Sequence, residues 1–170
     1  MLKKKNRILS IYPKKRSKDL FFVKLENGKT LELSNSILTS ESIKEGQEFD
    51  ASDLENILSK QEYQNLKNAG LTLLSYRMRS KKELYEKLLA KNYNSTSIEK
   101  VLIEFEKNGW LNDEEFGLAF SKDQINQNSL GPIALKYKLK KYISSDDMIS
   151  KILFSIYSCL LYTSDAADER

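Results

Sequence analysis

The sequence predicts a mainly α-helical protein in which tandem three-helix repeats form an elongated array, preceded by a small N-terminal β-hairpin unit. Apolar residues alternate along residues 20–33 but recur at helical spacing after residue 52. Helix-capping residues precede each apolar stripe, and one apolar pattern recurs at a constant offset of 51 residues. Six glycines and two prolines are too few turn residues for a sandwich or barrel along all 170 residues.

The first unit, residues 1–50, is expected to be a β-hairpin with short flanking elements. Five apolar side chains share one face on either side of the turn: Phe21, Val23, Leu25, Leu31 and Leu33. A three-residue loop with Gly28 in the left-handed conformation places Val23 opposite Leu31, whereas a two-residue turn places it opposite Glu32. We therefore expect the longer loop. Further strands are expected at residues 7–12 and 47–49, and one helical turn at 34–40.

Six helices are expected after residue 52, and each begins at a recognisable signal. Hydroxyl or amide side chains accept hydrogen bonds from the first amides of a helix, and proline is favoured at its first position. The expected starts are Ser52, Ser80, Thr96, Asn112, Gly131-Pro132, and Ser144 or Ser145.

The second and third helices recur as the fifth and sixth. At the constant offset Ser80 falls on Gly131, Leu84 on Leu135, Leu88 on Leu139, Ile98 on Ile149, Val101 on Ile152, Leu102 on Leu153 and Phe105 on Ile156. The pattern predicts one three-helix unit used twice, as residues 51–110 and 111–158, because stacked repeats bury a shared core.

The last residues, 159–170, read CLLYTSDAADER and resemble the translation of a sequencing adapter. We expect them to be a non-native tail that stands where a third repeat is missing. The tail carries Asp165, Asp168, Glu169 and Arg170. Without it, 27 basic and 21 acidic residues remain, so the net charge rises from +4 to +6.

Composition argues against an enzyme, a cofactor, a metal site or a small-molecule substrate. The chain has no histidine, and its single cysteine, Cys159, lies in the expected tail. A magnesium-dependent nuclease using Asp146 and Asp147 is disfavoured because adjacent carboxylates face different sides of a helix. The basic N-terminus is not followed by the apolar core of a signal peptide, and the longest apolar run, 152–162, is shorter than the roughly 20 residues that span a bilayer. We expect a cytoplasmic protein.

Two basic segments are the candidate binding residues for a partner or for DNA. The first comprises Arg77, Arg79, Lys81 and Lys82, and the second comprises Lys136, Lys138, Lys140 and Lys141. The second set lies away from the apolar stripe of its helix, which favours a surface for a polyanion. Plain solvation is the alternative for both, and the basic loop at residues 14–18 is expected to be solvated. The acidic run 113–115 is expected to interact with a helix dipole.

Three motifs in sequence order resemble the RecX family of recombinase regulators. They are LLSYRMRS at residues 73–80, GWLNDEEFG at 109–117 and GPIALKYKL at 131–139, and the resemblance covers about residues 7–157. Gly117 departs from the usual alanine and Asn92 from a common glycine. Gln124 and Gln127 stand where relatives often have arginine, which puts basic contacts there in doubt.

The resemblance implies a non-enzymatic protein that binds the RecA filament on single-stranded DNA. Such a protein restrains the ATPase and strand exchange of RecA in homologous recombination, DNA repair and the SOS response, and direct DNA contact is compatible with it. The resemblance also implies three repeats, of which this chain holds two. The alternative is a stand-alone basic DNA-binding helical module without a recombinase partner.

Overall fold

A computed structural model describes residues 6–165, with side chains described from residue 6 to residue 158. The chain divides into two compact units, an N-terminal unit of residues 1–65 and a C-terminal unit of residues 66–170. Helix α2 (Ala51–Tyr76) contributes residues to both units.

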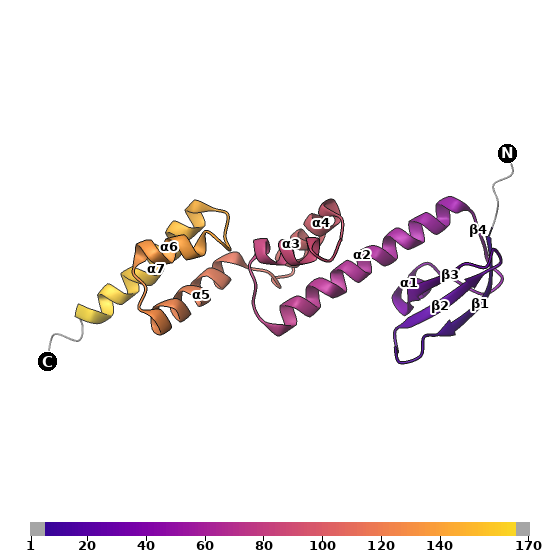
Figure 1. The fold of residues 1–170 in the computed structure, drawn as a ribbon, viewed down its shortest axis with the longest axis horizontal. Coiled ribbons are helices and arrows are strands. Elements are labelled where there is room, and N and C mark those ends of the chain that lie inside the picture. Colours follow the sequence, from indigo (N-terminus) through magenta and orange to yellow (C-terminus); the bar gives the residue numbers. More distant parts are fainter. Residues whose placement is uncertain (1–5, 166–170) are drawn as a thin grey trace. The chain divides into compact units, whose positions relative to one another are not determined.

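A four-stranded antiparallel sheet forms most of the N-terminal unit (Figure 1). Its strands, in the spatial order β3-β2-β1-β4, are β1 (Asn6–Pro13), β2 (Leu20–Leu25), β3 (Thr30–Ser34) and β4 (Glu48–Phe49), and helix α1 (Asn35–Ser40) follows β3. Val23 pairs with Leu31, and Gly28 has a φ of 83°. The predicted three-residue hairpin loop is therefore confirmed, since this register keeps the apolar side chains on one face.

The core of the N-terminal unit lies between the sheet, α1 and the first part of α2. Its buried residues are Ile8, Val23, Leu25, Leu33, Ile37, Ile43, Phe49 and Ile57. Gln61 of α2 is also buried, and its Oε1 accepts a hydrogen bond of 2.7 Å from the backbone N–H of Ser34. That contact ties α2 to the end of β3.

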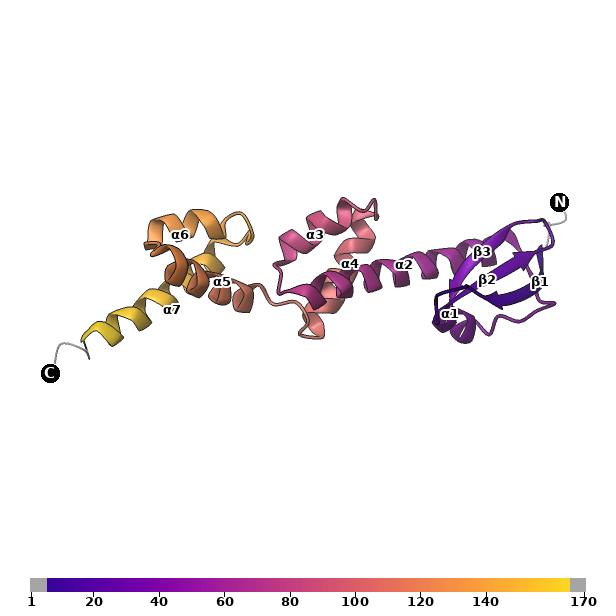
Figure 2. The same ribbon diagram turned by 60° about the horizontal axis from the view of Figure 1, so that its bottom comes forward.

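Helices are the only regular secondary structure in the described part of the C-terminal unit. After α2 come α3 (Lys81–Leu89), α4 (Ser95–Lys107), α5 (Asp113–Asn128), α6 (Pro132–Leu139) and α7 (Asp146–Asp165). Helix α3 packs against α4, and α7 packs against both α5 and α6 (Figure 1 and Figure 2). The predicted fold class, mainly helical with a small N-terminal strand unit, is confirmed.

The repeat is visible in the helix boundaries. Helix α3 begins at Lys81 and α6 at Pro132, while α4 begins at Ser95 and α7 at Asp146. Both offsets equal the 51 residues found in the sequence. We call the part of α2 after residue 65, with α3 and α4, the first repeat, and α5, α6 and α7 the second repeat.

Four of the six predicted helix starts are confirmed. Ser80 and Asn112 cap α3 and α5, and Gly131 precedes Pro132 at the start of α6. The sequence left Ser144 or Ser145 open for α7, and the Oγ of Ser145 accepts from the N–H of Met148.

Two predicted starts are wrong by two residues. Helix α2 begins at Ala51, because Asp50 accepts from the N–H of Asp53 while the Asp53 carboxylate accepts from the N–H of Asp50. Helix α4 is capped by Asn94 instead of Thr96, since the Asn94 Oδ1 accepts hydrogen bonds from the backbone N–H groups of Thr96 and Ser97. Asp and Asn cap helices at least as well as Ser and Thr, so the earlier residue prevails.

Each repeat buries the apolar stripe that the offset predicted. In the first repeat the buried residues of that stripe are Leu84, Leu88, Ile98, Val101, Leu102 and Phe105, and in the second they are Leu135, Leu139, Ile149, Ile152 and Ile156. Leu153 is half-buried. These residues lie between α3 and α4 in the first repeat and between α6 and α7 in the second. The two three-helix units are therefore packed in the same way.

The predicted boundaries at residues 50, 110 and 158 stay predictions. Helix α2 starts at Ala51 and runs without interruption past residue 65. The backbone of α7 continues to Asp165, through most of the expected non-native tail. The rest of that tail, residues 166–170, lies outside the described residues.

Candidate nucleic-acid and partner interface

The eight predicted cations lie in two places in the C-terminal unit. Arg77, Arg79, Lys81 and Lys82 occupy the α2–α3 junction and the first turn of α3. The other four occupy α6 and the turn after it. Helix α6 ends at Leu139, so Lys140 and Lys141 lie beyond the helix. The expectation of four lysines on one helix is wrong in this respect, because the chain turns toward the buried Ile143.

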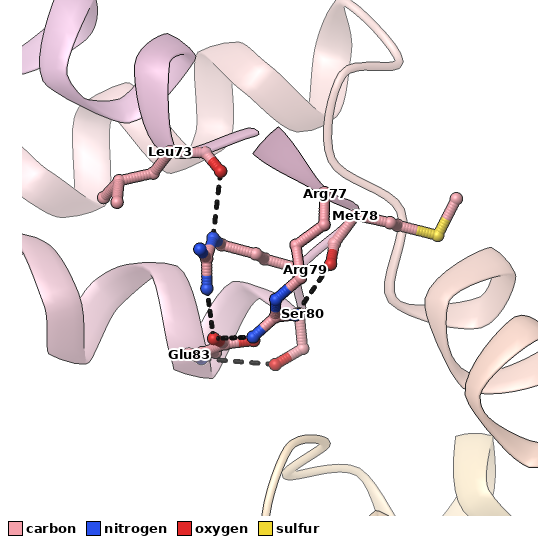
Figure 3. A network of polar contacts seen from close by, with 6 residues as sticks. All are labelled: Leu73, Arg77, Met78, Arg79, Ser80 and Glu83. Carbon is pink, nitrogen blue, oxygen red and sulfur yellow. Dashed lines mark hydrogen bonds and ion pairs between the residues drawn. The ribbon is translucent and has the colours of Figure 1, made fainter. Parts of the chain in front are cut away.

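A polar network closes the α2–α3 junction (Figure 3). The Nε of Arg79 donates to the carbonyl of Leu73 at 2.9 Å, and its Nη1 donates to Oε1 of Glu83. The Nη2 of Arg77 donates to the same carboxylate oxygen at 2.5 Å, while the Ser80 Oγ accepts from the N–H of Glu83. One carboxylate oxygen is therefore shared between two guanidinium groups.

Burial separates the two arginines. Arg79 has an exposed fraction of 9%, whereas the side chain of Arg77 is 53% exposed. The second oxygen of Glu83, Oε2, is buried and has no hydrogen-bond partner among the described residues. Arg79 thus neutralises a buried carboxylate and holds the end of α2, so it is poorly placed to reach a phosphate. Arg77 has an open side and suits an outside contact better.

The two cations of α3 lie near α4 and the start of the second repeat. The ammonium of Lys81 forms an ion pair of 2.9 Å with Glu106, and the backbone N–H of Lys81 donates to Oδ1 of Asp113 at 2.6 Å. A groove with a volume of about 520 Å³ lies between the repeats, and Lys82 lines it together with Lys81 and Asp113. Lys81 is therefore engaged within the molecule, and Lys82 is the more available of the two.

Asp113 joins the two repeats through a contact that the sequence did not reveal. It lies in the first turn of α5, as expected for a partner of the helix dipole, but its carboxylate also binds the first amide of α3. Burial raises the pKa of Asp113, the nearby carboxylate of Glu106 raises it further, and the Lys81 N–H opposes both. The two residues are separated by 32 positions, and no local pattern marks such a pair.

The second group of cations is also unequal. The ammonium of Lys138 donates to Oε1 of Gln124 at 2.6 Å, and Lys140 pairs with Asp146 at 3.0 Å. Lys136 and Lys141 are exposed, and neither side chain has a hydrogen bond or ion pair to another residue that the structure describes. These two lysines therefore present the least compensated charge of the group.

A small groove beside Lys141 combines cations with aromatic rings. Its volume is about 270 Å³, and its lining residues are Phe120, Gln124, Lys138, Lys141 and Tyr142. The Phe120 and Tyr142 ring centroids lie 5.1 Å apart. The apolar spacing along each helix did not reveal this groove. The available signal was the difference between the repeats, because Ala69 and Lys91 occupy the equivalent positions of the first repeat.

Three further observations concern metal sites, the candidate nuclease residues and membrane-spanning helices in the described part. Between residues 6 and 158 no cluster of three or more acidic, histidine or cysteine side chains is arranged to hold a metal ion. Asp146, considered for a nuclease, instead pairs with Lys140. No helix of this part has the length and apolar character needed to cross a membrane.

Comparison with known proteins gives a consistent result. Residues 67–105 match the family model described as RecX, first three-helix domain. The resemblance to the RecX family is thereby confirmed. Regulatory protein RecX of Streptococcus uberis is 26% identical over 141 residues, which cover 83% of this chain and 55% of that protein. Regulatory protein RecX of Bacillus cereus is 31% identical over 136 residues, covering 78% and 50% respectively.

Solved RecX structures share the fold. One crystal structure of regulatory protein RecX matches with a TM-score of 0.73 at 21% identity, over 89% of this chain and 74% of that chain. RecX from Lactobacillus salivarius matches with a TM-score of 0.52 at 24% identity, over 55% and 60%. This chain spans about half the length of the curated RecX relatives that it matches.

Proposed function

We propose that this chain acts as a RecX-type regulator in the cytoplasm, where it binds the RecA filament on single-stranded DNA and inhibits its ATPase and strand exchange. The observation that carries the proposal is the match of residues 67–105 to the first three-helix domain of RecX. The curated relatives bear the name regulatory protein RecX, and the resemblance to that family implies the recombinase partner.

The distribution of charge supports a filament partner. Arg77, Lys82, Lys136 and Lys141 each keep at least part of a cationic side chain available in the C-terminal unit. Cations held on packed helices and on the turns that join them present a fixed pattern to a polyanion, and this favours recognition of an ordered assembly.

The direct test titrates the 170-residue chain into RecA on single-stranded DNA while ATP hydrolysis is followed. We expect inhibition at protein concentrations well below those that coat the DNA, because a regulator acts through the filament. Inhibition that appears only when the DNA is saturated, and that fades steeply with salt, would contradict the proposal.

Charge reversal then locates the inhibitory surface. Changing Lys138, Lys140 and Lys141 to Glu should weaken inhibition of the ATPase while helicity by circular dichroism stays unchanged, because these residues lie on a rigid repeat. The matched control changes Lys15, Arg16 and Lys18 to Glu, three exposed cations of a loop in the N-terminal unit. Equal losses in both variants would contradict the assignment to the second repeat.

The second candidate function is a stand-alone DNA-binding module, favoured by the net charge of +6 without the last twelve residues. Such a module binds DNA equally well with and without RecA. Measuring the affinity for naked single-stranded DNA and for the RecA filament, at two salt concentrations, separates the two. A regulator prefers the filament at both.

A further inference from the structure

We propose that the groove between α5 and α6 binds one nucleotide of a single-stranded nucleic acid. In this assignment the base stacks on one of the rings of Phe120 and Tyr142, which are inclined at 55° to each other, and contacts the edge of the other. The neighbouring phosphate binds Lys138 and Lys141. The inference goes beyond the proposed regulatory function, because the groove acts in it without a recombinase.

The aromatic part of the groove is a supported platform. Phe116 is 5% exposed and lies behind the other two rings, with ring centroids 5.9 Å from Phe120 and 5.7 Å from Tyr142. Phe120 and Tyr142 themselves are half-buried and line the groove. A ring whose far side is packed holds its position, and a partly exposed ring offers a surface on which any base can stack.

The cationic part of the groove is held in place for an anion. Lys138 uses one of its three ammonium donors on Gln124 at 2.6 Å, which fixes the nitrogen and leaves two donors. Lys141 is exposed at the other side of the groove and has no partner among the described side chains. The five lining residues include no carboxylate. A phosphate therefore meets two cations without a competing negative charge.

The size of the groove favours a single base. A volume of about 270 Å³ is below the roughly 300–1,000 Å³ typical of pockets that enclose a drug-sized ligand. An acidic protein segment would use the lysines but would leave the pair of rings without a function. Stacking together with phosphate binding uses both, and this combination is the usual basis of single-strand recognition.

The first repeat provides a natural comparison. Its equivalents of Phe120 and Tyr142 are Ala69 and Lys91, and its equivalent of Lys141 is Ala90. The rings and the free lysine are thus specific to the second repeat, although the apolar positions that pack the two repeats correspond. Packing alone does not demand them.

The stacking step is tested with a short fluorescent oligothymidylate, whose anisotropy is followed as the 170-residue chain is added without RecA. Tyr142→Leu and Phe120→Leu keep apolar volume but remove the ring. Each should weaken binding at least about fivefold, the effect of losing one stacked base. Tyr142→Phe keeps the ring and should bind as the unmodified chain does. Unchanged affinity in both leucine variants would overturn the inference.

The phosphate step has a matched pair of variants on exposed lysines, for which unfolding is not a concern. Lys141→Gln should weaken binding and reduce the slope of log affinity against log salt by about 0.7, the loss of one phosphate contact to a single strand. Lys122→Gln removes an exposed lysine of α5 that lies outside the groove, so it should change little. Equal effects would show diffuse attraction and overturn the assigned site.

The location of the base is tested by photocross-linking with an oligonucleotide that carries 5-iododeoxyuridine. Adducts are expected on Tyr142 or Phe120, and adducts confined to other peptides would overturn the inference. An oligouridylate should bind comparably and a duplex more weakly, because bases in a duplex are already stacked. Displacement by an acidic peptide that survives Tyr142→Leu would instead assign the groove to a protein ligand.

The outcome is distinct from that of the ATPase titration. Oligonucleotide binding that depends on the groove, in a chain that leaves RecA unaffected, would contradict the regulatory function alone. If the leucine variants still inhibit RecA, the regulatory function does not depend on this groove.

Discussion

The two repeats share the starting points of their second and third helices but differ at the entry to the second helix. In the first repeat Arg79, Ser80 and Glu83 hold this turn with a buried ion pair and a hydroxyl cap. In the second repeat the equivalent residues are Leu130, Gly131 and Ala134, and Gly131 makes no side-chain cap. The same backbone turn is therefore compatible with a polar network or with apolar residues and a proline at the first helical position.

The difference extends to the contact between the repeats. The N–H of Lys81 donates to Asp113, whereas the equivalent residue in the second repeat is Pro132, which has no N–H. In the second repeat the hydroxyl of Tyr157 donates to the carbonyl of Leu130 at 2.6 Å. The first repeat thus uses ionisable groups both inside its turn and toward its neighbour, and its stability should depend on charge more than that of the second.

The largest expected effect is the loss of the buried guanidinium. Arg79→Ala leaves the carboxylate of Glu83 buried with one exposed partner and removes the donor to Leu73. Breaking a buried pair on one side typically destabilises by about 3–5 kcal/mol. Arg77→Ala removes the other partner of the same oxygen, but that side chain is half exposed, so the change should be about 0–1 kcal/mol. Urea unfolding of the unmodified chain, Arg79→Ala and Arg77→Ala measures both losses of stability.

The same comparison is sharpened by giving the first repeat the residues of the second. The double variant Arg79→Leu with Glu83→Ala removes both charges, so no unpaired ion stays buried. It should recover most of the stability lost in Arg79→Ala, because buried pairs are often replaceable by apolar residues. A double variant as unstable as Arg79→Ala would show that the turn of the first repeat requires the network.

A smaller effect is expected at two glycines that let helices approach closely. A Cβ on Gly70 would lie 2.6 Å from Cε2 of Phe105, whereas a Cβ on Gly117 would clash still more closely with Cδ1 of Ile152 and lie 2.9 Å from Cδ1 of Ile143. A ring moves only as a whole, but an isoleucine end can change rotamer. Gly70→Ala should therefore lower the free energy of unfolding by about 1–2 kcal/mol, after the gain of about 1 kcal/mol in helix propensity.

Gly117→Ala is the matched variant, and its free energy of unfolding should stay within about 0.5 kcal/mol of the unmodified chain, because crowding and propensity nearly cancel. Alanine is also the residue that the RecX resemblance leads us to expect at this position. Thermal unfolding followed at the helical signal measures both variants. A greater loss for Gly117→Ala than for Gly70→Ala would reverse the proposed order of packing rigidity.

The repeats, the hairpin register and four helix starts were predictable because each depends on local spacing. The two misplaced starts also depend on local residues, and they show that a stronger cap two positions earlier prevails over a capping-box match. The candidate site was predictable only as a set of charges. The segment from Arg77 to Lys82 contains a buried and an exposed arginine that no local pattern distinguishes. The groove with Phe120 and Lys141 requires three separate segments to meet, so spacing along one helix could not reveal it.

The smallest expected effect concerns Asp113, where the repeats meet. Burial raises the pKa of its carboxyl above the value of the unfolded chain, so the folded chain holds the proton more tightly. The contribution of this group to stability is therefore greatest at low pH and is lost as pH rises above about 4. Asp113→Asn keeps an oxygen for the Lys81 N–H without the charge, so its stability relative to the unmodified chain should increase between about pH 4 and pH 7.

The expected gain is under about 1 kcal/mol, because Asp113 is only partly buried and its carboxylate also interacts favourably with the N-terminus of α5. Urea unfolding at the two pH values measures the difference between variant and unmodified chain. Asp147→Asn, which removes an exposed first-turn carboxylate of α7, controls for the loss of a first-turn charge. If Asp113→Asn is less stable at neutral pH and recovers in acid, the ionised carboxylate stabilises the contact between the repeats, and the burial of Asp113 matters less than its bond to Lys81.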